Sequence, residues 1–165
     1  MAFLSSAAAG LAPPALANDA AMQAFAEHCF SPRMTDALAD RLLATTGARV
    51  DFYDLNPGFA EAPSPAETAA TPGTDRRCEL AFDGARGAAA AEAAAAGLAS
   101  EGIAAEAPLP LSPRPDETTT LRGARFLNPQ RIAVVETGTR PGPNGPETFL
   151  RVERLTPEAS REAAR

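Results

Sequence analysis

Two cysteines are the residues with the clearest capacity for covalent chemistry in this sequence. Cys29 lies on the apolar face of a helix expected over 19–30, and Cys78 lies on the apolar face of a strand expected over 76–83. Both side chains should point into one core, where a disulfide would close a loop of about 50 residues and stabilise the fold by about 4 kcal/mol. The alternative is two separate buried thiols. The cysteines lack a Cys-x-x-Cys spacing, so they do not indicate a redox-active pair.

The single histidine, His28, directly precedes Cys29. Neighbouring residues of a helix point about 100° apart, so these two side chains should not face each other as a Cys–His dyad would. We interpret His28 as a surface histidine. A hydrolase that uses it, or that uses carboxylates, is the least favoured alternative because the sequence contains no Gly-x-Ser-x-Gly elbow. We therefore predict no catalytic residue, no metal site and no cofactor, since one His and two Cys cannot build a Cys-rich or multi-His metal site.

A glycine-flanked arginine precedes the alanine-rich helix expected over 87–101. Gly84, Arg86 and Gly87 would lie at the helix N-terminus, where backbone N–H groups can hold an anion. The segment lacks the glycine spacings of the Rossmann and P-loop motifs. An ordinary strand-to-helix turn is the simpler interpretation.

The protein contains 15 basic residues, all of them Arg, and 21 acidic residues, which gives a net charge of −6. This balance argues against nucleic acid or an anionic membrane surface as the main partner. The charge is uneven: residues 18–111 hold six Arg and 14 acids (net −8), and residues 112–165 hold nine Arg and seven acids (net +2). We favour the interpretation that these two parts neutralise each other within the fold.

An arginine patch for an anionic ligand is the less favoured interpretation of the same residues. In the last expected strand, Arg151 and Glu153 share one face and Arg154 lies on the other. Arg131 is expected across from this strand.

The apolar pattern predicts the elements that position these groups. Helices are expected over 19–30, 32–46 and 87–101. Strands are expected over 49–55, 76–83, 130–137 and 148–155. Segments rich in Pro, Gly and polar residues are expected to be long loops over 59–75, 104–123 and 138–147.

The expected order is helix, helix, strand, strand, helix, strand, strand. This order predicts an α+β fold, in which a four-stranded antiparallel sheet carries helices packed on one face. A chain of 165 residues is long enough for one hydrophobic core.

Residues 1–17 carry no charged side chain and end in Ala-Leu-Ala, the small-x-small pattern that a signal peptidase reads. The basic segment that usually opens a signal is missing. The alternative is a retained apolar helix, which the Pro-Pro pair in this segment disfavours. We expect a signal peptide over 1–17, a single domain over 18–156 and a polar C-terminal tail over 157–165 that is frayed or forms a short helix, with no membrane span after cleavage.

The leader, a first helix that contains AFAEHCF and a later strand that contains CELAF together resemble small exported proteins of alphaproteobacterial type. The resemblance covers only the leader and these two short motifs. It implies a periplasmic location and a disulfide between helix and strand. It implies no activity and no catalytic residues.

These observations favour a non-catalytic periplasmic accessory or protein-binding domain, such as a subunit, adaptor or inhibitor of an envelope complex. The polar residues converge in no recognised catalytic constellation. Such a domain would present a sheet edge or its long loops to a protein partner in the periplasm. The alternative is a periplasmic module that binds a small molecule or an anion.

Overall fold

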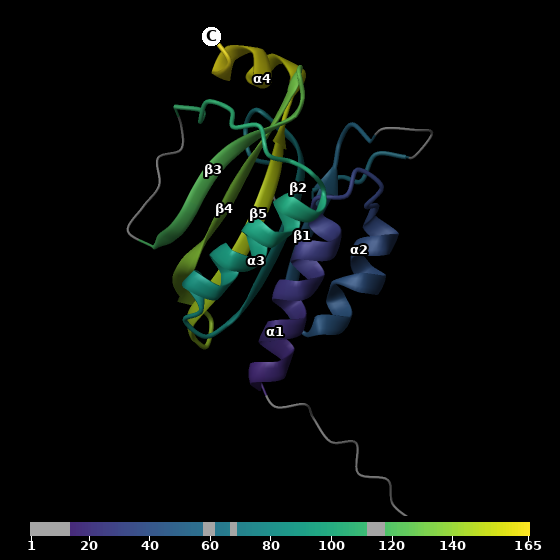
Figure 1. Cartoon of the computed structure of the whole chain (residues 1–165). Coiled ribbons are helices and arrows are strands. Elements are labelled where there is room, and N and C mark those ends of the chain that lie inside the picture. The colour runs from purple at the N-terminus through teal and green to yellow at the C-terminus, as the bar shows by residue number, and fades with distance from the viewer. Residues whose placement is uncertain (1–13, 58–61, 67–68, 112–117) are drawn as a thin grey trace, which may run out of the picture.

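The computed structural model describes residues 14–57, 62–66, 69–111 and 118–165. These residues form one antiparallel sheet with the strand order β1-β2-β5-β4-β3 (Figure 1). The strands are β1 (Arg49–Asp54), β2 (Thr74–Asp83), β3 (Thr119–Asn128), β4 (Arg131–Gly142) and β5 (Gly145–Leu155). The predicted α+β class and the single antiparallel sheet are confirmed.

The helical elements lie before, between and after the strands. They are α1 (Pro14–Ala24), a π-helical turn η1 (Phe25–Cys29), α2 (Asp36–Leu42), a 3-10 turn η2 (Ala44–Thr46), α3 (Gly87–Ser100) and α4 (Pro157–Ala163). The Thr35 hydroxyl accepts the Leu38 N–H at 3.3 Å and caps α2, and Gly47 ends the next turn with a φ of 79°.

The prediction of four strands is wrong because the sheet has five. Half of the additional strand, β3, falls in the segment that was expected to be a loop over 104–123. The β4–β5 connection is also shorter than expected, since Gly142 pairs with Gly145 and only two residues turn the chain. The element order therefore ends in three strands and a helix, not in two strands.

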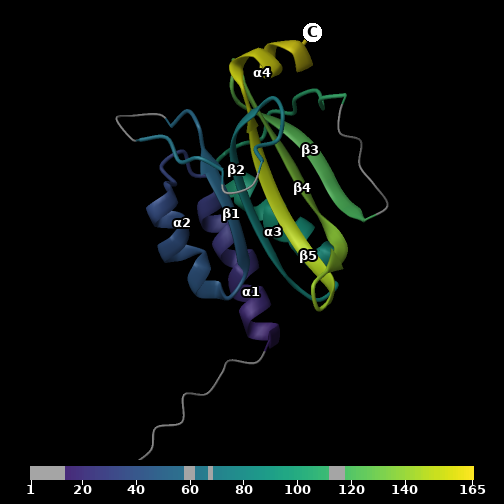
Figure 2. The same ribbon diagram turned by 180° about the vertical axis from the view of Figure 1, so that it is seen from behind.

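The helices do not all lie on one face, which corrects the second part of the predicted architecture. Figure 1 shows α1 and α3 in front of the sheet, and Figure 2 shows the opposite face with α4 at one end. Two side chains of α4, Ala159 and Ala163, pack against Ile132, Val134 and Leu155 on this opposite face. The segment expected as a polar tail over 157–165 thus includes a helix that contacts the sheet.

Alternate residues of β2 build the core between the sheet and its helices. Cys78, Leu80 and Phe82 are buried, as the alternation predicts, and belong to one cluster with Phe25 and Leu98. The Cys29–Cys78 disulfide is confirmed and joins η1 to β2, with Cα atoms 5.6 Å apart and a sequence separation of 49. It fastens the N-terminal helices to the second strand.

Helix α3 consists mainly of alanine, so it can lie close to its neighbours. Its closest approach is at Gly97, where an added Cβ would lie 2.5 Å from Phe30 Cε2 and 2.8 Å from the Ala26 carbonyl oxygen. The ring of Phe30 in turn packs edge-on against Phe25, with ring centroids 5.4 Å apart. A side chain at position 97 would therefore push α3 away from η1.

We expect Gly97→Ala to lower the free energy of unfolding by about 1–3 kcal/mol, because overpacking outweighs the helix propensity that alanine adds. Urea unfolding measures the change. The control is Ala96→Gly at an exposed position of the same helix, which should cost about 1 kcal/mol from propensity alone. A Gly97→Ala variant more stable than the natural protein would contradict the close approach.

The N-terminal part of the structure bears on the expected signal peptide without testing it. The expected cleavage point after residue 17 lies inside α1, and residues 1–13 lie outside the described residues. Asn18 Nδ2 donates to the Asp83 carbonyl oxygen at 3.1 Å, and Asp19 lies 2.9 Å from Arg86 Nη1. A chain that begins at Asn18 would keep both contacts.

Candidate functional site

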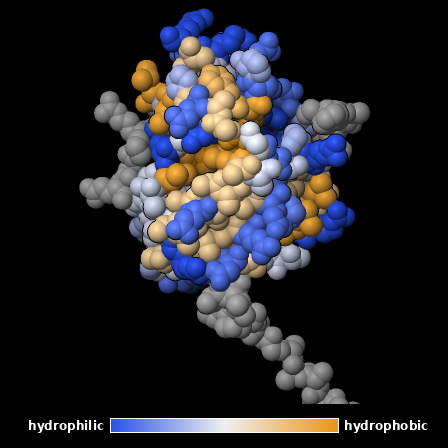
Figure 3. All heavy atoms as spheres, viewed as in Figure 1, coloured by the Kyte–Doolittle hydropathy of each residue, from blue (hydrophilic) through white to orange (hydrophobic). Residues whose placement is uncertain are grey.

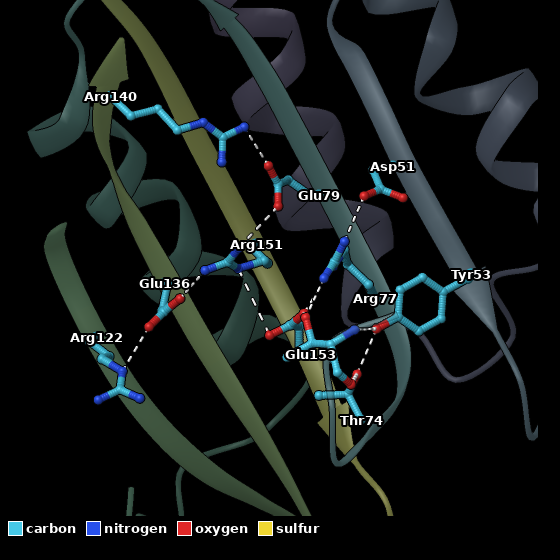
Figure 4. Close-up of polar contacts among 11 residues, drawn as sticks. Asp51, Tyr53, Thr74, Arg77, Glu79, Arg122, Glu136, Arg140, Arg151 and Glu153 are labelled. Atoms are coloured by element: carbon cyan, nitrogen blue, oxygen red, sulfur yellow. Dashed lines mark hydrogen bonds and ion pairs between the residues drawn. The ribbon is translucent and has the colours of Figure 1, made fainter. Parts of the chain in front are cut away.

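The face of the sheet opposite α1 and α3, here called the open face, carries a connected set of ion pairs (Figure 4). Arg77 Nε lies 2.9 Å from Glu153, and Arg77 Nη1 lies 2.8 Å from Asp51. Arg151 pairs with Glu136 and lies 3.5 Å from Glu79. The open-face network comprises Arg49, Asp51, Arg77, Glu79, Asp83, Arg122, Glu136, Arg140, Glu147, Arg151 and Glu153.

The antiparallel register explains why these charges meet. Asp51, Glu79, Arg151, Glu136 and Arg122 are successive partners across the five strands, so their side chains stand in one row. Glu79 and Glu136 in this row are buried between the arginines, and Asp51 at its end is half-buried. The network joins acids from before residue 112 to arginines from after it, as the uneven charge distribution predicted.

Ion pairs hold three arginines of the open face, Arg77, Arg140 and Arg151, in their charged form. Burial alone would lower the pKa of Arg77, but its hydrogen bonds to Asp51 and Glu153 outweigh burial and raise that pKa. Burial is likewise outweighed at Arg140, where Glu79 and Glu147 raise the pKa, and at Arg151, where Glu136 is the main partner. The charges of the open face are therefore well compensated.

A second group of arginines lies on the helix side of the sheet and faces a cavity of about 490 Å³. Arg76 comes from β2, Arg131 from β4 and Arg154 from β5. Apolar side chains make up much of the remaining wall, and Figure 3 shows such side chains gathered on this side of the molecule between α3 and α4. We call this cavity the arginine pocket; besides the arginines, its lining includes Phe30, Ile103, Leu127, Ala133 and Val152.

Two buried carboxylates, those of Asp54 and Asp75, form ion pairs with these arginines. Arg154 donates from Nη2 to Asp54 at 2.7 Å and from Nε to Asp75 at 2.7 Å, and Arg131 Nη2 donates to Asp75 at 2.6 Å. The register between β2 and β5 shifts between Thr74 and Arg76, and this irregularity brings Asp75 to the arginines. Three arginines thus share two carboxylates.

Arg76 is the least compensated of the three. Its Nη2 donates to the backbone oxygens of Ser31 and Met34, and its Nε lies 3.6 Å from Asp54, beyond hydrogen-bond distance. Burial lowers the pKa of Arg76 to about 10, with the charge of Arg154 acting in the same direction and Asp54 opposing it. This shift is opposite to that of Arg77, Arg140 and Arg151, because burial of Arg76 outweighs the attraction of Asp54 and Asp75.

Arg131 also has a hydrogen-bond donor without an acceptor in the part of the chain that the structure describes. Its Nε atom is buried and has no hydrogen-bond partner among the described residues. The sequence pattern placed Arg131 across from the last strand and Arg154 on the face away from Arg151. It gave no reason to add Arg76, which looked like one more polar residue at the start of a strand. The signal that identifies Arg76 is its register opposite Arg154, which requires the strand pairing.

The anion site predicted at Gly84, Arg86 and Gly87 stays a prediction. Gly84 donates its N–H to the Pro146 carbonyl oxygen at 2.7 Å, and Arg86 donates its backbone N–H to Thr148 Oγ1 at 2.7 Å. Gly87 lies at the start of α3 against Thr120 and Thr139. The three residues form a compact strand-to-helix turn.

His28 is half-buried, and its Nε2 lies 3.8 Å from Glu27. In the described part of the chain, no group of three or more His, Cys, Asp or Glu residues could hold a metal ion. Across the same residues, no helix has both the length and the apolar character needed to cross a membrane.

Comparison with protein-family models, curated proteins and solved structures gives no match to this chain, so the arginine pocket and the open face are themselves the basis for assigning a function.

Proposed function

We propose that the protein is a non-catalytic, periplasmic binding module for a small organic anion, which it holds in the arginine pocket. One observation carries the proposal: Arg76, Arg131 and Arg154, from three different strands, face one cavity and pair with only two carboxylates, Asp54 and Asp75. A third acid of the lining, Glu101, is exposed and forms no ion pair among the described residues. An arginine presents several N–H donors in a fixed fork that matches a carboxylate or phosphate. A bound anion would offer acceptors to Arg76 and Arg131, whose donors are incompletely paired among the described residues.

The size and lining of the pocket favour an anion with an apolar body. A volume of about 490 Å³ is in the range of sites for small molecules. Phe30, Ile103 and Leu127 offer apolar surface beside the guanidinium groups, and a fully hydrated inorganic ion would leave that surface unused. We therefore propose a carboxylate attached to an aromatic or aliphatic group as the ligand class.

The periplasmic location is supported by the apolar leader ending in Ala-Leu-Ala and by the disulfide, since such bonds persist in oxidising compartments. The intact mass of the protein purified from the periplasm of its host tests this part. Loss of residues 1–17 and of two protons relative to the dithiol is expected. A full-length mass with two free thiols would contradict export.

We expect phenylacetate to raise the melting temperature in a saturable way, and its neutral analogue phenylacetamide to have a much smaller effect at this pocket. At a concentration of 100 times Kd, mass action would add about 2.7 kcal/mol to the free energy of unfolding. Thermal unfolding at constant ionic strength, with sodium chloride replacing phenylacetate in the reference, measures the change.

Leu127→Glu should abolish stabilisation by phenylacetate, because it places a carboxylate at the pocket wall without removing an arginine. Leu127 is 37% exposed, so the substitution should leave the fold intact. The matched control is Leu109→Glu at a residue that is 41% exposed and lies outside this pocket. Equal stabilisation of both variants by phenylacetate, or no stabilisation of the natural protein, would rule out the arginine pocket as the site.

A second candidate function is the periplasmic accessory domain that binds a protein partner. It is favoured by two leucines on the Pro-rich segment before residue 112: Leu111 is 96% exposed and Leu109 is 41% exposed. Purification of the complex from periplasm with the natural protein and with a Leu109→Ser, Leu111→Ser variant tests it. A stoichiometric partner that the variant loses would support this function, and equal recovery with both would remove the leucines from consideration.

A further inference from the structure

A second cavity, of about 680 Å³, lies on the open face at the end that α4 covers. We call it the open-face pocket. Its floor is the sheet, its far wall is α4, and its side walls are the segment 71–74 and the Pro-rich segment 108–111. The apolar part of its lining includes Leu109, Val134, Leu155, Ala159 and Ala163.

One wall segment is fixed to the sheet by a buried group of hydroxyls. Tyr53 is fully buried, and its hydroxyl shares a hydrogen bond of 2.6 Å with Thr74 Oγ1 and accepts the Thr71 N–H at 3.1 Å. Thr71 Oγ1 donates to Glu153 at 2.5 Å. These contacts, drawn in part in Figure 4, give the pocket a preformed side wall.

Arg122 lines this pocket, and its terminal nitrogen Nη2 is enclosed and unpaired within the described part of the chain. A ligand would reach this atom once the guanidinium turns toward the cavity. Its side chain is only 8% exposed, and its Nε donates to Glu136 at 2.7 Å. Figure 4 shows its two terminal nitrogens pointing away from Glu136. The buried Nη2 has no hydrogen-bond partner among the described residues, although Arg122 lines the pocket. A buried donor without an acceptor is costly, and a ligand that brings one would remove this cost.

The charges around Arg122 determine which acceptor fits. Glu136 already neutralises Arg122, and the lining adds Glu153 and Glu162 against one further cation, Arg165. The pocket therefore holds three carboxylates and two guanidinium groups. Glu136 and Glu153 are also paired with Arg151 and Arg77 on the open face, so an anion would bring a charge for which the lining offers only Arg165, whereas a neutral oxygen acceptor would bring none.

We propose that the open-face pocket binds a neutral, largely apolar molecule that carries an amide or ester carbonyl, and that this carbonyl accepts a hydrogen bond from Arg122 Nη2. The apolar body would lie over Val134 and Leu155 and against Ala159 of α4. This site is separate from the arginine pocket, which is on the other face of the sheet, and does not depend on the function proposed for it.

The test uses 1-naphthylacetamide as the probe and 1-naphthylacetate as its anionic counterpart of nearly equal shape. Methyl NMR spectra of the full chain, with labelled Val, Leu and Ala methyl groups, report binding at Val134, Leu155 and Ala163. We expect saturable shifts of these methyl signals with the amide and affinity at least about tenfold weaker with the acetate, because only the amide avoids bringing a charge.

Two pairs of variants separate binding from folding. Arg122→Met should weaken the affinity for the amide by about tenfold or more, the usual effect of losing a hydrogen bond to a charged group. Arg125→Met on the same strand should leave that affinity unchanged. Ala163→Phe should block the pocket, whereas Ala164→Phe at an exposed position of the next residue should not. The proposal is overturned by an absence of saturable shifts in the natural protein, by equal affinity for amide and acetate, or by unchanged amide affinity in both Arg122→Met and Ala163→Phe.

Discussion

Replacing both Cys29 and Cys78 with alanine is expected to lower the free energy of unfolding by about 4 kcal/mol. The disulfide connects residues 49 apart in sequence and so restricts a long segment of the unfolded chain. Native single domains are stable by only about 5–15 kcal/mol, so this loss would leave a marginal fold. Urea unfolding of the two proteins without reductant measures the difference.

The same experiment with dithiothreitol supplies the control. Reductant should destabilise the natural protein toward the level of the double-alanine variant and should leave the variant unchanged. Because both cysteines are buried, reduction should require partial opening of the structure and should be slow in the absence of denaturant. A double-alanine variant as stable as the oxidised protein would show that the bond is dispensable for the fold.

Arg154→Met is expected to lower the free energy of unfolding by about 3 kcal/mol, because it leaves two buried carboxylates with fewer partners. Arg154 contacts Asp54 and Asp75, whose side chains are both almost fully buried. Methionine keeps most of the aliphatic stem, so the effect reports the lost ion pairs more than lost packing. The exposed Arg161→Met on α4 should change stability by less than about 0.5 kcal/mol.

A double-mutant cycle separates this electrostatic effect from a general disturbance. Asp75→Asn in the Arg154→Met background should cost less than Asp75→Asn alone, with a coupling of about 0.5–3 kcal/mol. Strictly additive costs would mean that Arg154 and Asp75 do not stabilise each other, and would contradict a stabilising ion pair between them beside the arginine pocket.

The elements with a regular apolar period could be predicted from the sequence. Cys78, Leu80 and Phe82 alternate with polar residues, and β2 is where that alternation indicated. The apolar period of the first helix likewise predicted that Cys29 points into the core, and the disulfide with Cys78 followed from the two positions. These predictions succeeded because one face of each element is buried against a single core.

Strand β3 could not be predicted in this way, because its two faces are covered to similar degrees. Most of its residues are half-buried, and it includes Arg122, Gly123 and Arg125 where a buried strand would have larger apolar side chains. The preceding prolines extended the apparent loop into the strand. Its edge is partly paired by a distant segment, since Glu106 bridges Arg125.

The open face shows that polar residues can be buried, so the polarity of a residue in the sequence does not predict its exposure. Glu79, Glu136 and Glu153 look like solvent-facing residues in the sequence, yet neighbouring arginines bury them. The arginine pocket has the same origin, because Arg76 and Arg154 are far apart in sequence and meet only once β2 pairs with β5. Pairing between strands, rather than local pattern, determines both sites.

The open-face network also has a consequence for behaviour on heating. The free-energy cost of removing charged groups from water falls as temperature rises, because the hydration of ions carries a large unfavourable entropy. The network joins eleven charged side chains across five strands. Its contribution to the free energy of unfolding should therefore be larger at about 60 °C than at about 25 °C, as is general for ion-pair networks. The open face would then lose less of its stabilising free energy on heating than the apolar core on the other face of the sheet.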